Sequence, residues 1–252
     1  MSKKLVIGNW KMNPATLDDA KNIIRKIRRT ANLLKNTVVV VCPPFVYTQS
    51  AISRRGPSTL KVGAQTVSYE KENSHTGEIS AKTLVDIGVE YVIAGHSEER
   101  ARNDTDEIVS RRVKAIIEAG MNAVVCVGER VRDDGGGYLE TLKSQIKNSL
   151  ADVPSSLAKN IIIAYEPVWA IGAKEAMMPE QIYEMSLFVK KVFSDIFSQN
   201  QAMKTLVIYG GSVNFRNARE IITVGKVDGL LVGRESVNTP GFVELLKAVD
   251  DI

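Results

Sequence analysis

Glu166 is the residue whose surroundings in the sequence most clearly suggest chemistry. It follows Ile161–Tyr165, an apolar run typical of a strand covered on both faces, and precedes Pro167, which lacks the N–H needed to continue a strand ladder. The carboxylate is therefore predicted to lie just past the end of a buried strand, under a roof of Trp169 and Ile171. Because shielding from water makes a carboxylate a stronger base, the segment predicts a general base beneath a lid. A structural ion pair or a solvated loop acid is the alternative for a single glutamate.

Polar residues follow other apolar runs in the same way. Asn9 and Lys11 come after residues 5–8, and His96 comes after residues 91–94. Alone, each has an ordinary interpretation, as a surface lysine or a hydrogen-bonded structural histidine. Their joint occurrence at strand ends, together with Glu166, favours a catalytic site.

Glycine-containing loops follow the last two apolar runs. Gly210-Gly211-Ser212 comes after residues 206–209, and Gly233-Arg234-Glu235-Ser236 comes after residues 229–232. Such loops expose backbone N–H groups and lead into short helices, an arrangement that binds phosphate. The pattern predicts a phosphorylated substrate.

The elements that must position these residues alternate regularly along the chain. Helix-type segments with start signals, such as those at Thr16, Thr105, Pro179 and Pro240, separate the apolar runs. This alternation predicts a parallel sheet in one α/β domain over residues 1–252, closed as a (β/α)8 barrel of eight parallel strands with surrounding helices. An open, doubly wound sheet is the main competitor. The eight runs are residues 5–8, 37–42, 60–64, 91–94, 123–127, 161–165, 206–209 and 229–232.

Composition narrows the class of protein. The chain has 252 residues, a net charge of +4 and 44% hydrophobic residues, which suits a full core and gives a mild attraction for small anions. The densest basic run, residues 25–29, lies in a helical pattern and is predicted to be a solvated helix face rather than a nucleic-acid site. Cys42 and Cys126 end apolar runs and are expected to be reduced, buried thiols of a cytoplasmic protein. We expect neither a signal peptide nor a membrane span.

The segment 65–78 is long, polar and without clear periodicity, whereas the other connections are short. Loops of this length tend to be functional or to bind something. Insertion into a second subunit is one way to keep such a segment ordered.

Motifs along the whole chain resemble those of the triosephosphate isomerase family. They are Gly8-Asn9-Trp10-Lys11, Gly95-His96-Ser97-Glu98, Cys126-Val127-Gly128-Glu129, Tyr165-Glu166-Pro167-Val168-Trp169, Tyr209-Gly210-Gly211-Ser212 and Leu231-Val232-Gly233, in the order of the family.

The resemblance implies a cytoplasmic homodimer, paired through the 65–78 loop, that interconverts dihydroxyacetone phosphate and D-glyceraldehyde 3-phosphate in glycolysis and gluconeogenesis. As a property of the family rather than of the spacing, Glu166 would move the proton and neutral His96 would act as the electrophile. Lys11 would offset developing charge, and Asn9 would orient the substrate. The implied phosphate grip is Gly172, Ser212, Gly233 and Arg234. No metal or other cofactor is implied.

Several positions depart from the family pattern. Ala173-Lys174-Glu175-Ala176 replaces the usual Thr-Gly-Lys-Thr of the lid, which predicts altered closure because a glycine is lost. Arg234 and Glu235 stand where glycine and alanine are common, and Glu99 stands where arginine is usual. In the 65–78 loop, Thr66 and Asn73-Ser74-His75 differ from the frequent Asn and Gly-Ala-Phe, which predicts a weaker dimer.

Two other functions stay open at this point. One is a different sugar-phosphate enzyme on a phosphate-binding barrel, which would share the phosphate loops but not the Asn9, Lys11, His96 and Glu166 set. The other is a barrel that binds phosphate or a protein partner without turnover, because a fold alone does not determine activity.

Overall fold

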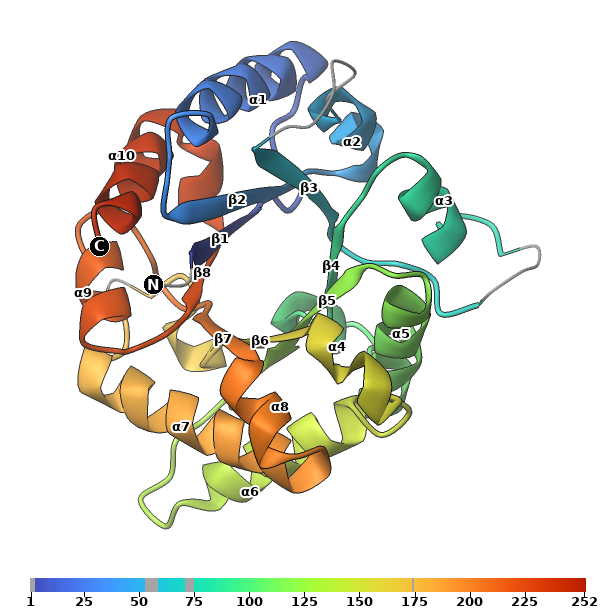
Figure 1. The fold of residues 1–252 in the computed structure, drawn as a ribbon, viewed down its shortest axis with the longest axis vertical. Coiled ribbons are helices and arrows are strands. Elements are labelled where there is room, and N and C mark those ends of the chain that lie inside the picture. Colours follow the sequence, from blue (N-terminus) through green and yellow to red (C-terminus); the bar gives the residue numbers. More distant parts are fainter. Residues whose placement is uncertain (1–2, 53–58, 71–74, 174) are drawn as a thin grey trace.

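Eight parallel strands form a closed barrel in the order of the chain, and helices surround it (Figure 1). The computed structural model describes residues 3–52, 59–70, 75–173 and 175–252. Hydrogen bonding between β1 and β8 closes the ring, with Leu5 opposite Gly229, so the open-sheet alternative is wrong. The strands are β1 (Lys4–Asn9), β2 (Thr37–Cys42), β3 (Leu60–Ala64), β4 (Tyr91–Ala94), β5 (Asn122–Val127), β6 (Ile161–Tyr165), β7 (Leu206–Tyr209) and β8 (Gly229–Val232).

The predicted strand positions are confirmed, except that β1 is one residue longer at each end and β5 is one residue longer at its start. Their apolar character has a direct cause. In β1, Leu5 and Ile7 pack inside the barrel while Val6 packs outside against the helices, so alternate residues face two different buried layers. Cys42 and Cys126 belong to the inner layer, where both are buried and free as predicted.

The predicted start signals lie at helix N-termini. Thr16 accepts a hydrogen bond from the Asp19 backbone N–H, and Thr105 caps the helix that begins at Asp106 in the same way. Pro179 and Pro240 lie in the first turn of their helices, where a missing N–H costs nothing. The helices are α1 (Leu17–Ala31), α2 (Phe45–Ala51), α3 (Ala81–Asp86), α4 (Ser97–Arg100), α5 (Asp106–Glu118), α6 (Gly137–Ser149), α7 (Pro179–Ile196), α8 (Gln199–Lys204), α9 (Ala218–Thr223) and α10 (Thr239–Asp250), with 3-10 turns η1 (Ser155–Asn160), η2 (Val168–Ala170) and η3 (Arg234–Val237).

The basic run on α1 is largely solvated, as predicted. Arg25, Lys26 and Arg29 are exposed, whereas Ile24 and Ile27 of the same helix are buried. None of the helices within the described ranges is long and apolar enough to cross a membrane.

The two ends of the 65–78 loop are joined to each other, and its first part is held against α5. The Ser68 N–H donates to the Ile79 carbonyl at 2.9 Å, and the Arg111 guanidinium lies 3.9 Å from the centre of the Tyr69 ring. Asn73 and Ser74 lie outside the described residues, while His75 is exposed. Pairing with a second subunit through this loop stays a prediction, as does the assignment of residues 1–252 to one domain.

Candidate active site

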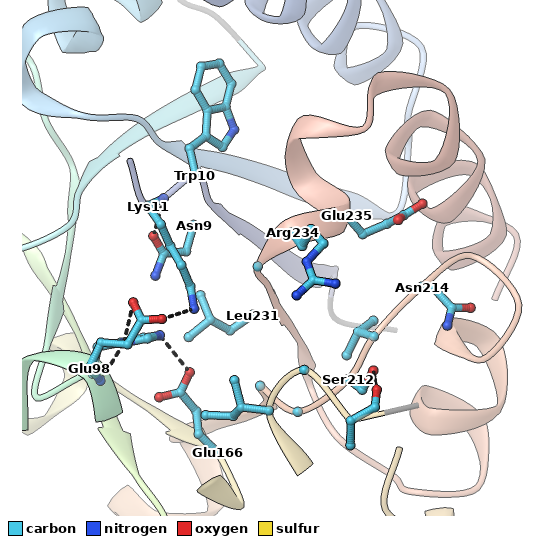
Figure 2. Close-up of a pocket in the computed structure, with 18 of the residues that line it drawn as sticks. Asn9, Trp10, Lys11, Glu98, Glu166, Ser212, Asn214, Leu231, Arg234 and Glu235 are labelled. Atoms are coloured by element: carbon cyan, nitrogen blue, oxygen red, sulfur yellow. Dashed lines mark hydrogen bonds and ion pairs between the residues drawn. The ribbon is translucent and has the colours of Figure 1, made fainter. Parts of the chain in front are cut away.

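One cavity of about 530 Å³ opens at the carboxyl ends of the strands, and all the residues predicted to act lie along it (Figure 2). This is the position expected for a barrel of this type, since each strand ends at the same mouth of the ring. The predicted residues that line the cavity are Asn9, Lys11, His96, Glu166, Gly172, Ser212, Gly233 and Arg234.

Glu166 and His96 face each other at the floor of this cavity. Glu166 is 3% exposed, and its Oε1 atom lies 3.5 Å from Nε2 of His96. His96 is also the N-cap of α4, where its Nδ1 accepts a hydrogen bond from the Glu98 backbone N–H at 3.2 Å. An imidazole that accepts at Nδ1 carries its proton on Nε2 when neutral. The local fold therefore aims an N–H donor of His96 at the space beside the Glu166 carboxylate.

Lys11 reaches the same space from the end of β1. Its backbone has a positive φ of 52°, and its N–H donates to Oδ1 of Asn9 at 3.1 Å. Its carbonyl accepts from Nε2 of Gln65 at 2.8 Å. This bent backbone directs the ammonium group across the cavity to Oε1 of Glu98, 2.7 Å away.

Glu98 is a site residue that the sequence reasoning did not single out. Partial burial opposes its ionisation, but the hydrogen bond and charge of Lys11 outweigh that effect and lower the pKa of Glu98. The feature of the sequence that could have identified Glu98 is its position two residues after His96, at the start of a helix that follows a strand. Glu98 therefore stays ionised and holds the Lys11 ammonium near Glu166.

The roof predicted over Glu166 is partly wrong. Ile171 lines the cavity, but Trp169 does not, and its side chain is 42% exposed. The 3-10 turn η2 turns the indole toward Glu129, whose Oε1 accepts from Nε1 of Trp169 at 3.0 Å. Glu166 is instead enclosed from below, because a Cβ atom at Gly210 would lie 2.6 Å from Cγ of Glu166.

Glu129 anchors the first part of the lid, residues 167–170, through Trp169. It was not identified as a separate site residue from the sequence. It is 2% exposed and accepts hydrogen bonds from the hydroxyl of Tyr165 and from Arg132, besides that from Trp169. A buried carboxylate is stable only with such a set of donors. The feature of the sequence that could have identified Glu129 is its position two residues past the end of β5.

Two contacts attach the second part of the lid, at Ala173 and Met177, to the end of β7 and to the loop that follows it. The Ser212 hydroxyl donates to the carbonyl of Ala173 at 2.9 Å, and the Met177 N–H donates to the Tyr209 hydroxyl at 3.1 Å. Burial raises the pKa of Tyr209 to about 12, so its hydroxyl stays protonated and neutral. The described part of the lid thus lies over the cavity.

The residues of the predicted phosphate grip also line the cavity, namely Gly172, Ser212, Gly233 and Arg234. Gly172 has a φ of 72°, which glycine adopts without strain. Lys174 lies outside the described residues, and Glu175 is exposed and does not line the cavity. Glu99, which stands where the family usually has arginine, forms an ion pair with Arg102 at 3.5 Å.

The arrangement supports proton transfer next to a carbonyl group in a small anion. A carboxylate, an imidazole N–H donor and an ammonium group surround one space, and glycine-containing loops line its other end. Within the described ranges, no three His, Cys, Asp or Glu side chains are grouped to hold a metal ion. Cys126 lies at the barrel side of the site, where burial and then the charge of Glu166 raise the pKa of its thiol.

Comparison with known proteins gives consistent results over the full chain. A family model described as triosephosphate isomerase matches residues 4–249. A protein named triosephosphate isomerase from Fusobacterium nucleatum is 37% identical over 250 residues, which covers 98% of this chain and 99% of the relative. Proteins of the same name from Chloroherpeton thalassium and Carboxydothermus hydrogenoformans are each 36% identical, over 252 and 249 residues, and cover at least 98% of both chains.

Proposed function

The chain belongs to the triosephosphate isomerase family, and we propose that the cavity at the mouth of its barrel is where the reaction of that family takes place. The protein is an isomerase that interconverts dihydroxyacetone phosphate and D-glyceraldehyde 3-phosphate, a reaction of glycolysis and gluconeogenesis. The observation that carries the proposal is the 3.5 Å approach of Nε2 of His96 to Oε1 of Glu166 within a cavity that also holds Lys11.

In this proposal Glu166 is the base. Its carboxylate removes a proton from the carbon beside the substrate carbonyl, while the N–H of His96 donates to the carbonyl oxygen. The electron pair of the broken C–H bond forms an enediol or enediolate. The proton of the adjacent hydroxyl group then moves to the former carbonyl oxygen, and Glu166 returns its proton to the neighbouring carbon as the new carbonyl group forms. The isomerisation is then complete, and no atom or electron is gained or lost.

Lys11 and Asn9 support this step electrostatically. The Lys11 ammonium offsets the negative charge that develops on the substrate oxygens, and Asn9, which is 5% exposed, orients the substrate and the Lys11 backbone. Gly172, Ser212, Gly233 and Arg234 hold the phosphate, mainly through backbone N–H groups. Water exclusion under the lid would protect the enediolate from loss of phosphate.

We further propose that the protein works as a cytoplasmic homodimer. Its two free, buried cysteines suit a reducing compartment. The 65–78 loop, held at both ends, is the segment through which we expect two copies to pair, near the Asn9 and Lys11 region of the partner.

Turnover of each triose phosphate in a coupled assay tests the proposed roles. Glu166→Gln keeps the shape of the side chain but removes its basicity, so kcat should fall by about 10²–10⁴-fold. Glu175→Gln removes a carboxylate from the exposed part of the lid and is the matched control, with near wild-type turnover expected. Undiminished turnover in the Glu166 variant would contradict the assigned base, and absence of turnover in the wild type would favour a barrel that only binds phosphate.

A further inference from the structure

Arg234 is a cation of the cavity that has no partner among the residues that the structure describes. The charged side chains along the cavity are Lys11, Glu98, Glu166, Arg234 and Glu235. Lys11 is already paired with Glu98 at 2.7 Å. By contrast, Arg234 makes no hydrogen bond or ion pair with any residue in the described part of the chain, and it is exposed.

The side chain of Arg234 is directed into the cavity. Figure 2 shows its guanidinium in the space between Lys11, Leu231 and Ser212, whereas the neighbouring Glu235 points away from this space. Oε1 of Glu235 accepts from Nδ2 of Asn238 at 3.2 Å, which fixes it on the outer side of η3. A carboxylate next to Arg234 in sequence is thus kept away from its guanidinium.

The backbone that carries Arg234 belongs to the barrel rather than to the lid. The Gly233 carbonyl accepts from both the N–H and the hydroxyl of Ser236, at 2.9 and 2.7 Å, and Ser236 is fully buried. The Arg234 side chain therefore starts from a fixed turn whose position does not depend on the lid.

Charge in the cavity makes an unpaired cation significant. Among the described residues that face this space, Glu98 and Glu166 together carry more negative charge than Lys11 offsets, which opposes the entry of a phosphate ester. A guanidinium presents N–H donors in a planar fork that matches two phosphate oxygens. Arg234 is the described cavity residue that can supply this contact without first breaking an ion pair.

We propose that the Arg234 guanidinium binds the phosphate group of the substrate directly and is a specificity-determining residue for the phosphorylated ester. This inference rests on the proposed function and extends it, because the phosphate grip would then include a side-chain ionic contact besides the backbone N–H groups. The contact forms at the fixed rim and so binds phosphate before the lid closes.

The test compares Arg234→Gln and Arg234→Lys with the wild type for three readouts. These are the KM for glyceraldehyde 3-phosphate, the inhibition constant of inorganic phosphate, and kcat/KM for glyceraldehyde, which lacks the phosphate. Loss of a charged hydrogen bond at an exposed position should raise both the KM and the phosphate inhibition constant about 10-fold in Arg234→Gln. Turnover of glyceraldehyde should stay within about 2-fold. Arg234→Lys should be intermediate, because an ammonium keeps the positive charge but lacks the planar fork of N–H donors that a guanidinium presents.

Arg219→Gln is the matched control. Arg219 is an exposed arginine of α9 that does not line the cavity, so its variant loses the same charge without the contact. Equal effects in the two variants, or an unchanged phosphate inhibition constant in Arg234→Gln, would overturn the proposal. So would an equal loss with glyceraldehyde, since Arg234 would then act on something other than phosphate. Failure of the proposed function is a separate result, in which the wild type turns over neither triose phosphate.

Discussion

A single methyl group at Gly210 should displace the proposed base. Gly210 follows β7 and donates its N–H to the Tyr165 carbonyl at 2.9 Å. A Cβ atom there would lie 2.6 Å from Cγ and 3.1 Å from Oε1 of Glu166. Since carbon atoms in contact stay about 3.5–4.0 Å apart, the Glu166 side chain must retreat by about 1 Å in Gly210→Ala.

The size of the effect follows from that displacement. A misplacement of about 1 Å typically costs about 10²-fold in rate, so we expect kcat to fall by about that factor. The KM should change less than kcat, because the added methyl group meets Glu166, whereas Ser212 of the proposed phosphate grip lies two residues farther along this loop. Overpacking of this kind costs about 1–3 kcal/mol of stability, which leaves a domain of this size folded at room temperature.

The assay is coupled turnover of glyceraldehyde 3-phosphate, with thermal unfolding and inhibition by inorganic phosphate measured on the same preparation. Retained phosphate inhibition shows that the cavity persists. Gly135→Ala is the control, because Gly135 lies in an exposed loop and an added Cβ would meet only a side-chain oxygen of Asp133. A folded Gly210→Ala protein with kcat within about 2-fold of the wild type would refute the assignment of Glu166 as a precisely positioned base.

Two further predictions concern assembly and acid stability. We expect sedimentation analysis to give twice the 27.7 kDa mass of one chain. The dimer should dissociate partly on dilution, because His75 replaces the aromatic residue that is frequent in the family. A 27.7 kDa species at every concentration would reject the dimer. Partial burial alone would raise the pKa of Asp250, but the backbone N–H groups of Lys35 and Asn36 donate to its carboxylate and lower it. The resulting stabilisation is complete above the ordinary aspartate pKa of about 3.9 and is lost as the pH falls through the lowered value. Calorimetry of Asp250→Ala should therefore show that the free energy of unfolding falls by about 1–2 kcal/mol at pH 7 and by less in acid. Asp251→Ala, which changes an exposed aspartate, is the control. A decrease that is independent of pH, or equal in the two variants, would contradict this prediction.

Much of the architecture was predictable because its causes are local. The run Ile161–Tyr165 is apolar at every position, and Pro167 stops further pairing, so the end of β6 beside Glu166 follows from these residues alone. Thr16 and Thr105 begin helices because a hydroxyl next to a free backbone N–H caps it wherever the rest of the chain goes. The motifs around His96 and Glu166 added the family and its reaction.

The contacts within the site depended on tertiary structure. Lys11 and Glu98 are 87 residues apart, and their 2.7 Å contact exists because closure of the barrel brings the ends of β1 and β4 to one mouth. The sequence placed Trp169 over Glu166, whereas a 3-10 turn and the buried carboxylate of Glu129 hold it elsewhere. The freedom of Arg234 likewise depends on where Glu235 and Asn238 point. Backbone periodicity is set by neighbours in the chain, but a side chain finds its partner only among groups that the closed barrel has brought within reach.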